Sequence, residues 1–368
     1  MIKTFLTISM FCVALALIAS CSSSSGVRSS SPQKPHHTKD GFKNLYVQDS
    51  EKNFFDFLKV RFFGETEWAD HRLYADDVPF QKVELSKLKM PARDGQVTWL
   101  GHSSFLIQMA GLNILTDPIF SERASPIPFA GPKRYKAHAM DYAELPHIDI
   151  VLISHNHYDH LDSPSLQMLA QRATQTSSKS NIPTQFYVPL GLKTFLEDLD
   201  IPGKQISEMD WWNVLKGPKA SEAYQVIALP SQHWSARGTN DRRETLWASY
   251  AVKAAGKTIY FAGDTGYNDV QFKQIGQYLQ SVDLALIPIG GYLPRDFMRL
   301  YHVNPEEALR IHQDIGSKFS IGMHWGTFPM TAEAPMEPPL KLNEQRRSLD
   351  ISENAFITIA IGETYLLN

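Results

Sequence analysis

Four potential metal ligands stand within six residues, directly after an apolar stretch. The stretch 151–154 leads to His155, His157, Asp159 and His160. Neutral imidazole and carboxylate groups are natural ligands of zinc and similar divalent metals where no thiolate is at hand. A strand end can fix the short loop, so that all four side chains point to one place. One ion does not need so many ligands, and the pattern therefore predicts a site for two metal ions.

Short apolar runs separated by turns predict the strands that must position this loop. They lie at 97–100, 104–109, 113–116, 148–154, 185–189, 225–229, 246–252, 258–261, 284–289 and 319–323. Helices are predicted at 163–172, 270–278 and 305–314, the last with Asn304 as its cap and Pro305 at its start. An aromatic stretch at 54–63 favours a helix packed on the domain over a lipid-facing element. Strands that alternate with helices indicate a layered α/β domain.

The spacing His-x-His-x-Asp-His over residues 155–160 resembles the signature of the metallo-β-lactamase superfamily. The resemblance implies an α/β fold of the αβ/βα sandwich type, with two mixed sheets flanked by helices. It also implies a dinuclear metal site at one edge of that sandwich, for which we expect two zinc ions. Two ions can lower the pKa of a shared water and stabilise both the attacking and the leaving oxygen of a displacement.

Further ligands are implied at later strand ends, and three residues stand in such places. His233 follows the run 225–229, Asp264 follows 258–261 and His324 follows 319–323. By position, one ion would be held by His155, His157 and His233, the other by Asp159, His160 and His324, with Asp264 as the bridge. Asp117 and the turn at His102 are candidates for orienting the imidazoles. For His102 we favour a structural role.

Several other motifs resemble the family of N-acyl-phosphatidylethanolamine-hydrolysing phospholipase D. They occupy residues 116–126, 131–134, 287–298, 302–308, 324–328 and 337–344, so the resemblance runs from about Val97 to the C-terminus. It implies a zinc-dependent phosphodiesterase that releases an N-acylethanolamine and phosphatidic acid, by attack of metal-bound hydroxide on phosphorus. A superfamily lactonase or another phosphodiester or ester hydrolase of the bacterial envelope is the alternative, because the fold does not choose the substrate.

The same resemblance suggests residues that act on the substrate. His302 would contact the phosphate or protonate the leaving alkoxide, and Asp159 and Asp264 complete the expected catalytic set. Tyr158, Tyr292 and Arg295 are candidate substrate contacts, although aromatic packing or a fold-stabilising charge is an equally ordinary use of such residues. The chain departs from the animal members before Val97, where those enzymes build a membrane-facing cavity and a dimer. A homodimer therefore stays an open option.

The N-terminal residues predict export and a lipid anchor. Lys3 and the apolar stretch 5–19 are typical of a signal peptide. Residues 17–21 resemble the lipobox of bacterial lipoproteins, which implies cleavage before Cys21 and its lipidation; an uncleaved helix with a chance cysteine is the alternative. We therefore divide the chain into a signal peptide at 1–20, a lipidated Ser- and Pro-rich tether at 21–45 and a catalytic domain at 46–368. Ser22 favours the outer membrane, on its periplasmic side, in a host that has one.

Cysteine usage and charge exclude several function classes. The chain of 368 residues has two cysteines, Cys12 and Cys21, and both fall in the export segment. A domain without cysteine has no disulfides, thiol nucleophiles or thiolate-bound metals. The formal net charge of -3 leaves no basic excess for nucleic acid, so the expected partners are a phospholipid substrate and, through the anchor, the membrane.

Overall fold

The computed structural model describes residues 34–50, 54–175, 183–217 and 224–367. Residues Pro35–Asn368 belong to one compact unit. The predicted signal peptide, Cys21 and the tether up to residue 33 lie outside the described residues. Among the described residues, no helix has the length and apolar character needed to cross a bilayer.

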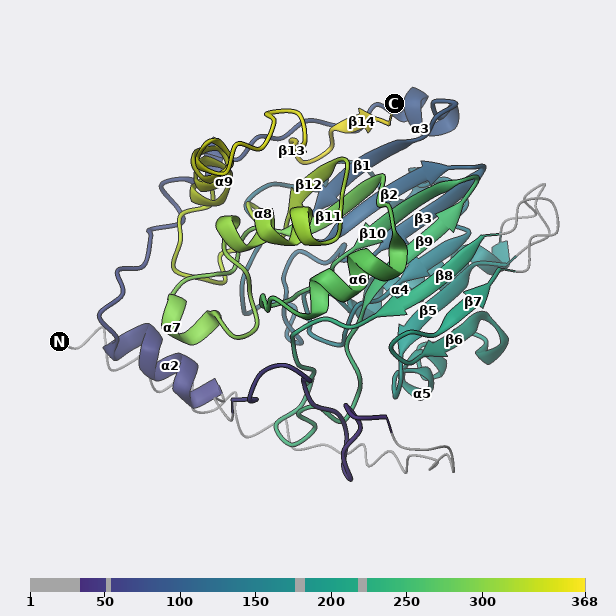
Figure 1. Ribbon diagram of the computed structural model, residues 1–368. Coiled ribbons are helices and arrows are strands. Elements are labelled where there is room, and N and C mark those ends of the chain that lie inside the picture. Colours follow the sequence, from purple (N-terminus) through teal and green to yellow (C-terminus); the bar gives the residue numbers. More distant parts are fainter. Residues whose placement is uncertain (1–33, 51–53, 176–182, 218–223, 368) are drawn as a thin grey trace. The chain divides into compact units, whose positions relative to one another are not determined.

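The first of two seven-stranded sheets gathers strands from both ends of the unit (Figure 1). Its order is β14 (Thr364–Leu366), β1 (Gln96–Gly101), β2 (Ser104–Met109), β3 (Leu112–Thr116), β4 (Ile150–Leu152), β5 (Gln185–Pro189) and β6 (Ile206–Met209). The pairs from β14 to β3 are antiparallel, and those from β3 to β6 are parallel. The carboxyl ends of β3, β4 and β5 therefore meet at one edge of this sheet.

The second sheet repeats this pattern with later strands. Its order is β13 (Phe356–Ile357), β12 (Ser320–Met323), β11 (Leu284–Pro288), β10 (Lys257–Phe261), β9 (Ser249–Ala254), β8 (Gln225–Leu229) and β7 (Val214–Lys216). The pairs from β7 to β10 are antiparallel, and those from β10 to β13 are parallel. The predicted αβ/βα sandwich, with two mixed sheets flanked by helices, is confirmed.

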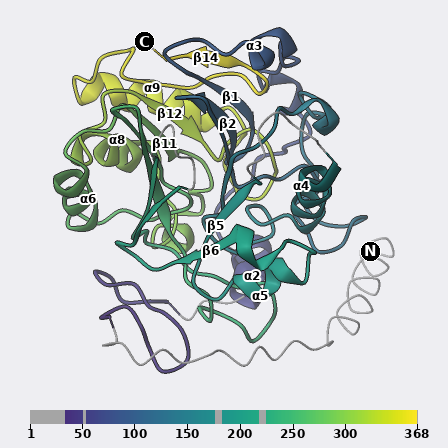
Figure 2. The same cartoon turned by 90° about the vertical axis from the view of Figure 1, so that its right-hand side faces the viewer.

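Helices cover the sheets on both sides. Figure 2 shows α6 (Gln271–Leu279) and α8 (Pro305–Asp314) on one side and α4 (Ser163–Gln175) on the other. The remaining helices are α2 (Phe54–Phe63), α3 (Leu85–Lys89), α5 (Lys193–Glu197), α7 (Arg295–Met298) and α9 (Glu337–Ser348), with 3-10 turns at Ala75–Asp77, Tyr142–Glu144 and Gly203–Gln205. The start of α8 is as predicted, because Asn304 and Glu307 form a reciprocal capping box before and after Pro305.

Burial explains why the inner strands contain few polar residues. Every residue of β1, β2, β4, β11 and β12 is buried. Sheets that are covered on both faces select continuous apolar runs, and these made the strands visible in the sequence. The run 148–154 yields only Ile150–Leu152 because the Ser154 N–H donates to the Asp117 carboxylate at 2.7 Å instead of joining a strand ladder.

An N-terminal strap, residues 36–50, packs on the domain and overlaps the end of the predicted tether at 21–45. His36 is buried against Trp211, and its Nε2 lies 2.7 Å from an oxygen of Asp210. Asn44 is also buried, and its amide donates to the carbonyl oxygen of His233 at 2.9 Å. The packed chain therefore begins near Pro35. Composition alone missed these contacts, because they join residues far apart in the sequence.

Candidate metal centre

All seven predicted ligands converge at the edge where both sheets end. His155, His157, Asp159 and His160 follow β4 of the first sheet. His233 follows β8, Asp264 follows β10 and His324 follows β12, all in the second sheet. Each half of the sandwich thus supplies part of the ligand set, as the strand ends predict.

The donor atoms form two groups with one carboxylate between them. In the first group, His157 Nδ1 lies 2.8 Å from His155 Nε2 and 3.2 Å from His233 Nε2. In the second, Asp159 Oδ2 lies 3.2 Å from His160 Nε2 and 3.5 Å from His324 Nε2. Asp264 Oδ2 lies 3.2 Å from His160 Nε2 and 3.9 Å from His233 Nε2, so it reaches both groups as a bridging ligand would.

Buried polar atoms without hydrogen-bond partners test whether these residues suit metal ions. Within the described part of the chain, no hydrogen bond is made by His157 Nε2, His160 Nε2, Asp264 Oδ1 or either ring nitrogen of His324. Buried polar atoms are normally hydrogen-bonded, and leaving them unpaired costs free energy. The residues fit divalent ions, which would provide the missing partners for such nitrogen and oxygen donors.

In the metal-free protein, protonated imidazoles offset the negative charge of the buried carboxylates. Burial by itself lowers the pKa of His324, but the carboxylates of Asp264 and Asp159 outweigh it and raise the pKa to about 9. Burial also opposes the charged form of His160, yet the same carboxylates raise its pKa well above the ordinary value. Both imidazoles are therefore positively charged at neutral pH, whereas an imidazole must be neutral to bind a metal ion.

Metal uptake should consequently release protons in a pH-dependent way. We expect zinc binding at about pH 7 to displace protons from His160 and His324, and binding at about pH 10 to displace fewer, because His324 has then already lost its proton. Apparent zinc affinity should rise with pH over this range. Titration calorimetry in buffers of different ionisation enthalpy counts the protons. Equal proton release at both pH values would contradict the charge assignment.

Asp117 holds one of the ligands in place, as the sequence suggests. Its carboxylate is fully buried and accepts from His160 Nδ1 at 2.6 Å and from the Ser154 hydroxyl at 2.5 Å. In the neutral ring that binds a metal ion, this contact would keep the proton of His160 on Nδ1 and leave Nε2 as the ligand atom.

Replacing Asp117 by asparagine should weaken metal binding without removing a ligand. We expect the affinity for one zinc ion to fall by about 10- to 100-fold, because the ring of His160 loses its charged acceptor. Competition with a chromogenic chelator measures this change. The matched control is the exposed Asp198→Asn. An unchanged affinity in Asp117→Asn would remove Asp117 from the centre.

His102 takes a larger part than the structural role that we favoured. Its Nε2 lies 2.9 Å from Asp159 Oδ2, and its ring lies 4.1 Å from that of His324. Burial, and then the neighbouring His324, lower the pKa of His102 to about 3, so its imidazole is neutral. A neutral ring with its proton on Nε2 can donate to Asp159 and orient that ligand. The two residues are 57 positions apart in the sequence, and no sequence pattern predicts their contact.

The predicted substrate residues divide into one at the centre and three around it. His302 Nδ1 lies 3.7 Å from Asp264 Oδ2. The guanidinium of Arg295 instead pairs with Glu307 and donates to the carbonyl oxygen of His302 at 2.7 Å. The hydroxyl of Tyr292 donates to Glu337 at 2.7 Å, and that of Tyr158 donates to the carbonyl oxygen of Arg237 at 2.8 Å. Arg295 thus positions His302. The hydroxyls of Tyr158 and Tyr292 each form a hydrogen bond with another group of the protein.

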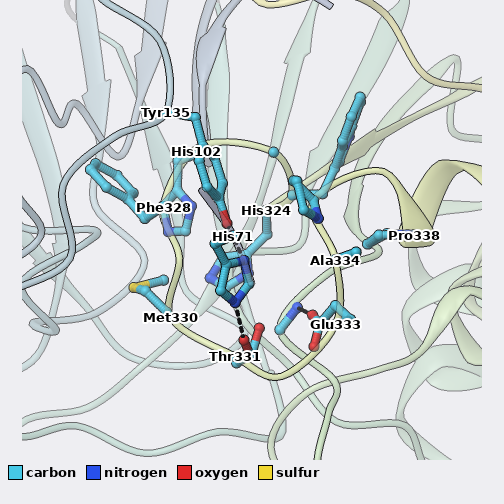
Figure 3. A pocket seen from close by; sticks show the side chains of 14 residues that line it. His71, His102, Tyr135, His324, Phe328, Met330, Thr331, Glu333, Ala334 and Pro338 are labelled. Carbon is cyan, nitrogen blue, oxygen red and sulfur yellow. Dashed lines mark hydrogen bonds between the residues drawn. The ribbon is translucent and has the colours of Figure 1, made fainter. Parts of the chain in front are cut away.

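A pocket opens beside the second ligand group (Figure 3). Its lining includes His102, His324, His71, Tyr135, Phe328 and Glu333. His71 comes from the stretch before Val97, and its Nε2 lies 2.9 Å from the carbonyl oxygen of Thr331. The N-terminal part of the catalytic unit therefore helps to wall the pocket, a role that the sequence left open.

Comparison with known proteins places this geometry in a family. A family profile described as the beta-lactamase superfamily domain matches residues 112–325, which include all seven predicted ligands. N-acyl-phosphatidylethanolamine-hydrolyzing phospholipase D 1 of Caenorhabditis elegans is 39% identical over 273 residues, covering 73% of this chain and 74% of that protein. The chain belongs to the N-acyl-phosphatidylethanolamine-hydrolysing phospholipase D family.

Other members and neighbours agree with this placement. An uncharacterised protein of Mycobacterium tuberculosis is 34% identical over 341 residues, 91% of this chain and 84% of that protein. The structure of a metallo hydrolase from Ignicoccus hospitalis shares the fold, with a TM-score of 0.53 and 21% identity over 74% of this chain and 97% of that one. This phospholipase D family member is therefore a metal-dependent hydrolase with a metallo-β-lactamase fold.

Proposed function

We propose that this protein is a zinc-dependent phospholipase D that hydrolyses N-acyl-phosphatidylethanolamine to N-acylethanolamine and phosphatidic acid. The observation that carries the proposal is the convergence of two donor groups around Asp264 in a chain that is 39% identical to a named enzyme of this activity. Two bound zinc ions would lower the pKa of a water and offset charge on the phosphodiester oxygens. His155, His157 and His233 would hold one ion, and Asp159, His160 and His324 the other.

The residues around the centre are suited to a phosphodiester. A water-derived oxygen would form the new bond to phosphorus while the bond from phosphorus to the ethanolamine oxygen breaks. The departing alkoxide needs a proton, and His302 beside Asp264 is the candidate to supply it. Gly291 lets the neighbouring loop approach closely: at φ +84, an added Cβ would lie 3.1 Å from His324 and 3.3 Å from His302.

We also propose that Cys21 carries lipid and anchors the protein in the bacterial envelope, at the periplasmic side of the outer membrane in a diderm host. The lipobox-like residues 17–21 and the polar tether after them support this placement. An anchor would keep the metal centre beside a membrane that contains its substrate.

Mass spectrometry of a lipid extract tests the reaction directly. The zinc-loaded protein should release N-acylethanolamine together with phosphatidic acid of matching acyl chains. Free fatty acid would reassign the protein to acyl hydrolysis, and cleavage of lactones without cleavage of phosphodiesters would make it a lactonase. The Asp264→Asn variant serves as the inactive control, and plasma mass spectrometry of the purified protein identifies its metal.

A further inference from the structure

We propose that His36, His37 and Asp210 form an additional zinc site that fastens the N-terminal strap. His36 Nε2 lies 2.7 Å from Asp210 Oδ1, and His37 Nε2 lies 3.0 Å from Asp210 Oδ2. One ligand atom of each residue lies within 4.8 Å of the other two. The three residues are distinct from the ligands of the metal centre, so the proposal is independent of the proposed reaction.

The backbone of the strap aims both imidazoles at one carboxylate. His37 pairs with Phe42 in an isolated bridge, and the N–H of Lys43 donates to the carbonyl oxygen of His36 at 2.9 Å. The strap lies close against the loop at Arg243, since an added Cβ on Gly41 would come within 2.1 Å of the Arg243 carbonyl oxygen. The two rings stand nearly perpendicular, at 88°, with their centroids 4.6 Å apart, and each Nε2 faces one oxygen of the same carboxylate.

The surroundings hold the ligands rigidly on one side and leave the other side accessible. The ring of His36 is stacked 4.2 Å from that of Trp211, and the backbone N–H of Trp211 donates to Asp210 Oδ1 at 2.8 Å. The side chain of His36 is 3% exposed, whereas that of His37 is 24% exposed. Three protein ligands with solvent access for a fourth match the composition of an open zinc site.

The spacing also resembles that of the metal centre. There, His157 Nδ1 lies 2.8 Å from His155 Nε2 and 3.2 Å from His233 Nε2. A bound ion would tie the strap to the end of β6. Asn44 lies eight residues after His36, and its amide contacts the carbonyl oxygen of His233. The strap therefore reaches from this site to a predicted ligand of the metal centre.

Metal analysis of chosen variants tests the site. The full chain, purified in detergent and exchanged into zinc-free buffer, should keep about three zinc ions, and His37→Gln should keep about two. Glutamine can still donate a hydrogen bond to Asp210, so this variant separates a metal site from a hydrogen-bonded clasp. His36→Phe, which retains an aromatic ring on Trp211, should lose the same ion. The control is Asp40→Asn, an exposed position on the same strap.

A second readout follows the strap itself. Zinc should slow tryptic cleavage after the exposed Lys39 and Lys43 in the unchanged protein and in Asp40→Asn, but not in His37→Gln. Equal zinc counts in the unchanged protein and in His37→Gln would overturn the proposal in favour of a clasp without metal, whatever the number of ions in the metal centre. A third ion that persists in both histidine variants would overturn it too, because that ion would bind elsewhere.

Discussion

Replacing Asp264 by asparagine should abolish turnover and empty the metal centre. The Asp264 carboxylate lies 3.2 Å from His160 Nε2 and from His324 Nε2, and it is the group that reaches both donor sets. Asparagine keeps the shape but removes the charge that two divalent ions require. We expect activity to fall by at least about 1,000-fold and the zinc content to drop by at least one ion.

The metal-free fold should respond to the same change. Asp264 is almost fully buried among imidazoles whose protons it stabilises, and removing one partner of a buried charge pair costs about 3 kcal/mol or more. Denaturant unfolding of the zinc-free protein, with circular dichroism as the folding check, measures this loss. Full zinc content in a folded Asp264→Asn protein would refute its assignment as the bridging ligand.

Replacing His302 by glutamine should remove activity while leaving the zinc content unchanged. Burial lowers the pKa of His302 to about 3, so in the metal-free protein its imidazole is neutral. A neutral imidazole donates an N–H hydrogen bond to an oxygen of the leaving group, and transfer of a proton to the alkoxide requires that the bound phosphate anion raises the pKa of His302. General acid catalysis is worth about 100- to 10,000-fold, and kcat should fall by that amount.

The leaving group separates this role from a structural one. A phosphodiester whose alcohol is a good leaving group, such as a nitrophenol, needs no proton, so His302→Gln should recover most of its rate on that substrate. Loss of zinc would instead make His302 a ligand, since His302, His233 and Asp264 lie close enough to share an ion. Arg295→Lys offers a milder comparison, because Arg295 donates to the carbonyl oxygen of His302 and not to its imidazole.

Local chemistry explains how much of the centre could be predicted. Ligands that follow strand ends were found because a covered sheet demands apolar runs, and each run stops where the functional residues start. Helix α8 was found because Asn304 and Pro305 mark its beginning. The contacts of His102 with Asp159, and of Asn44 with His233, depend on how distant segments pack. No local pattern encodes them, so they needed the structure.

Short or unusual elements were missed for related reasons. Strands β7, β13 and β14 have two or three residues each, too few to show a period. Helix α9 has prolines at positions 338 and 339, within its first turn, and in a sequence these suggest a break before they suggest a start. Arg295 was a candidate substrate contact because its charge is visible in a sequence, whereas its pairing with the half-buried Glu307 is not.

Because its ligands come from both sheets, the metal centre can form only after both sheets have folded. Residues 155–160 leave the ribosome long before His324, the last of the seven ligands. A complete centre therefore cannot exist until β12 has joined the second sheet. A chain exported unfolded, as the proposed signal peptide requires, would acquire its ions in the compartment where it folds. The metal supply of the envelope, and not that of the cytoplasm, would then decide which ion it carries.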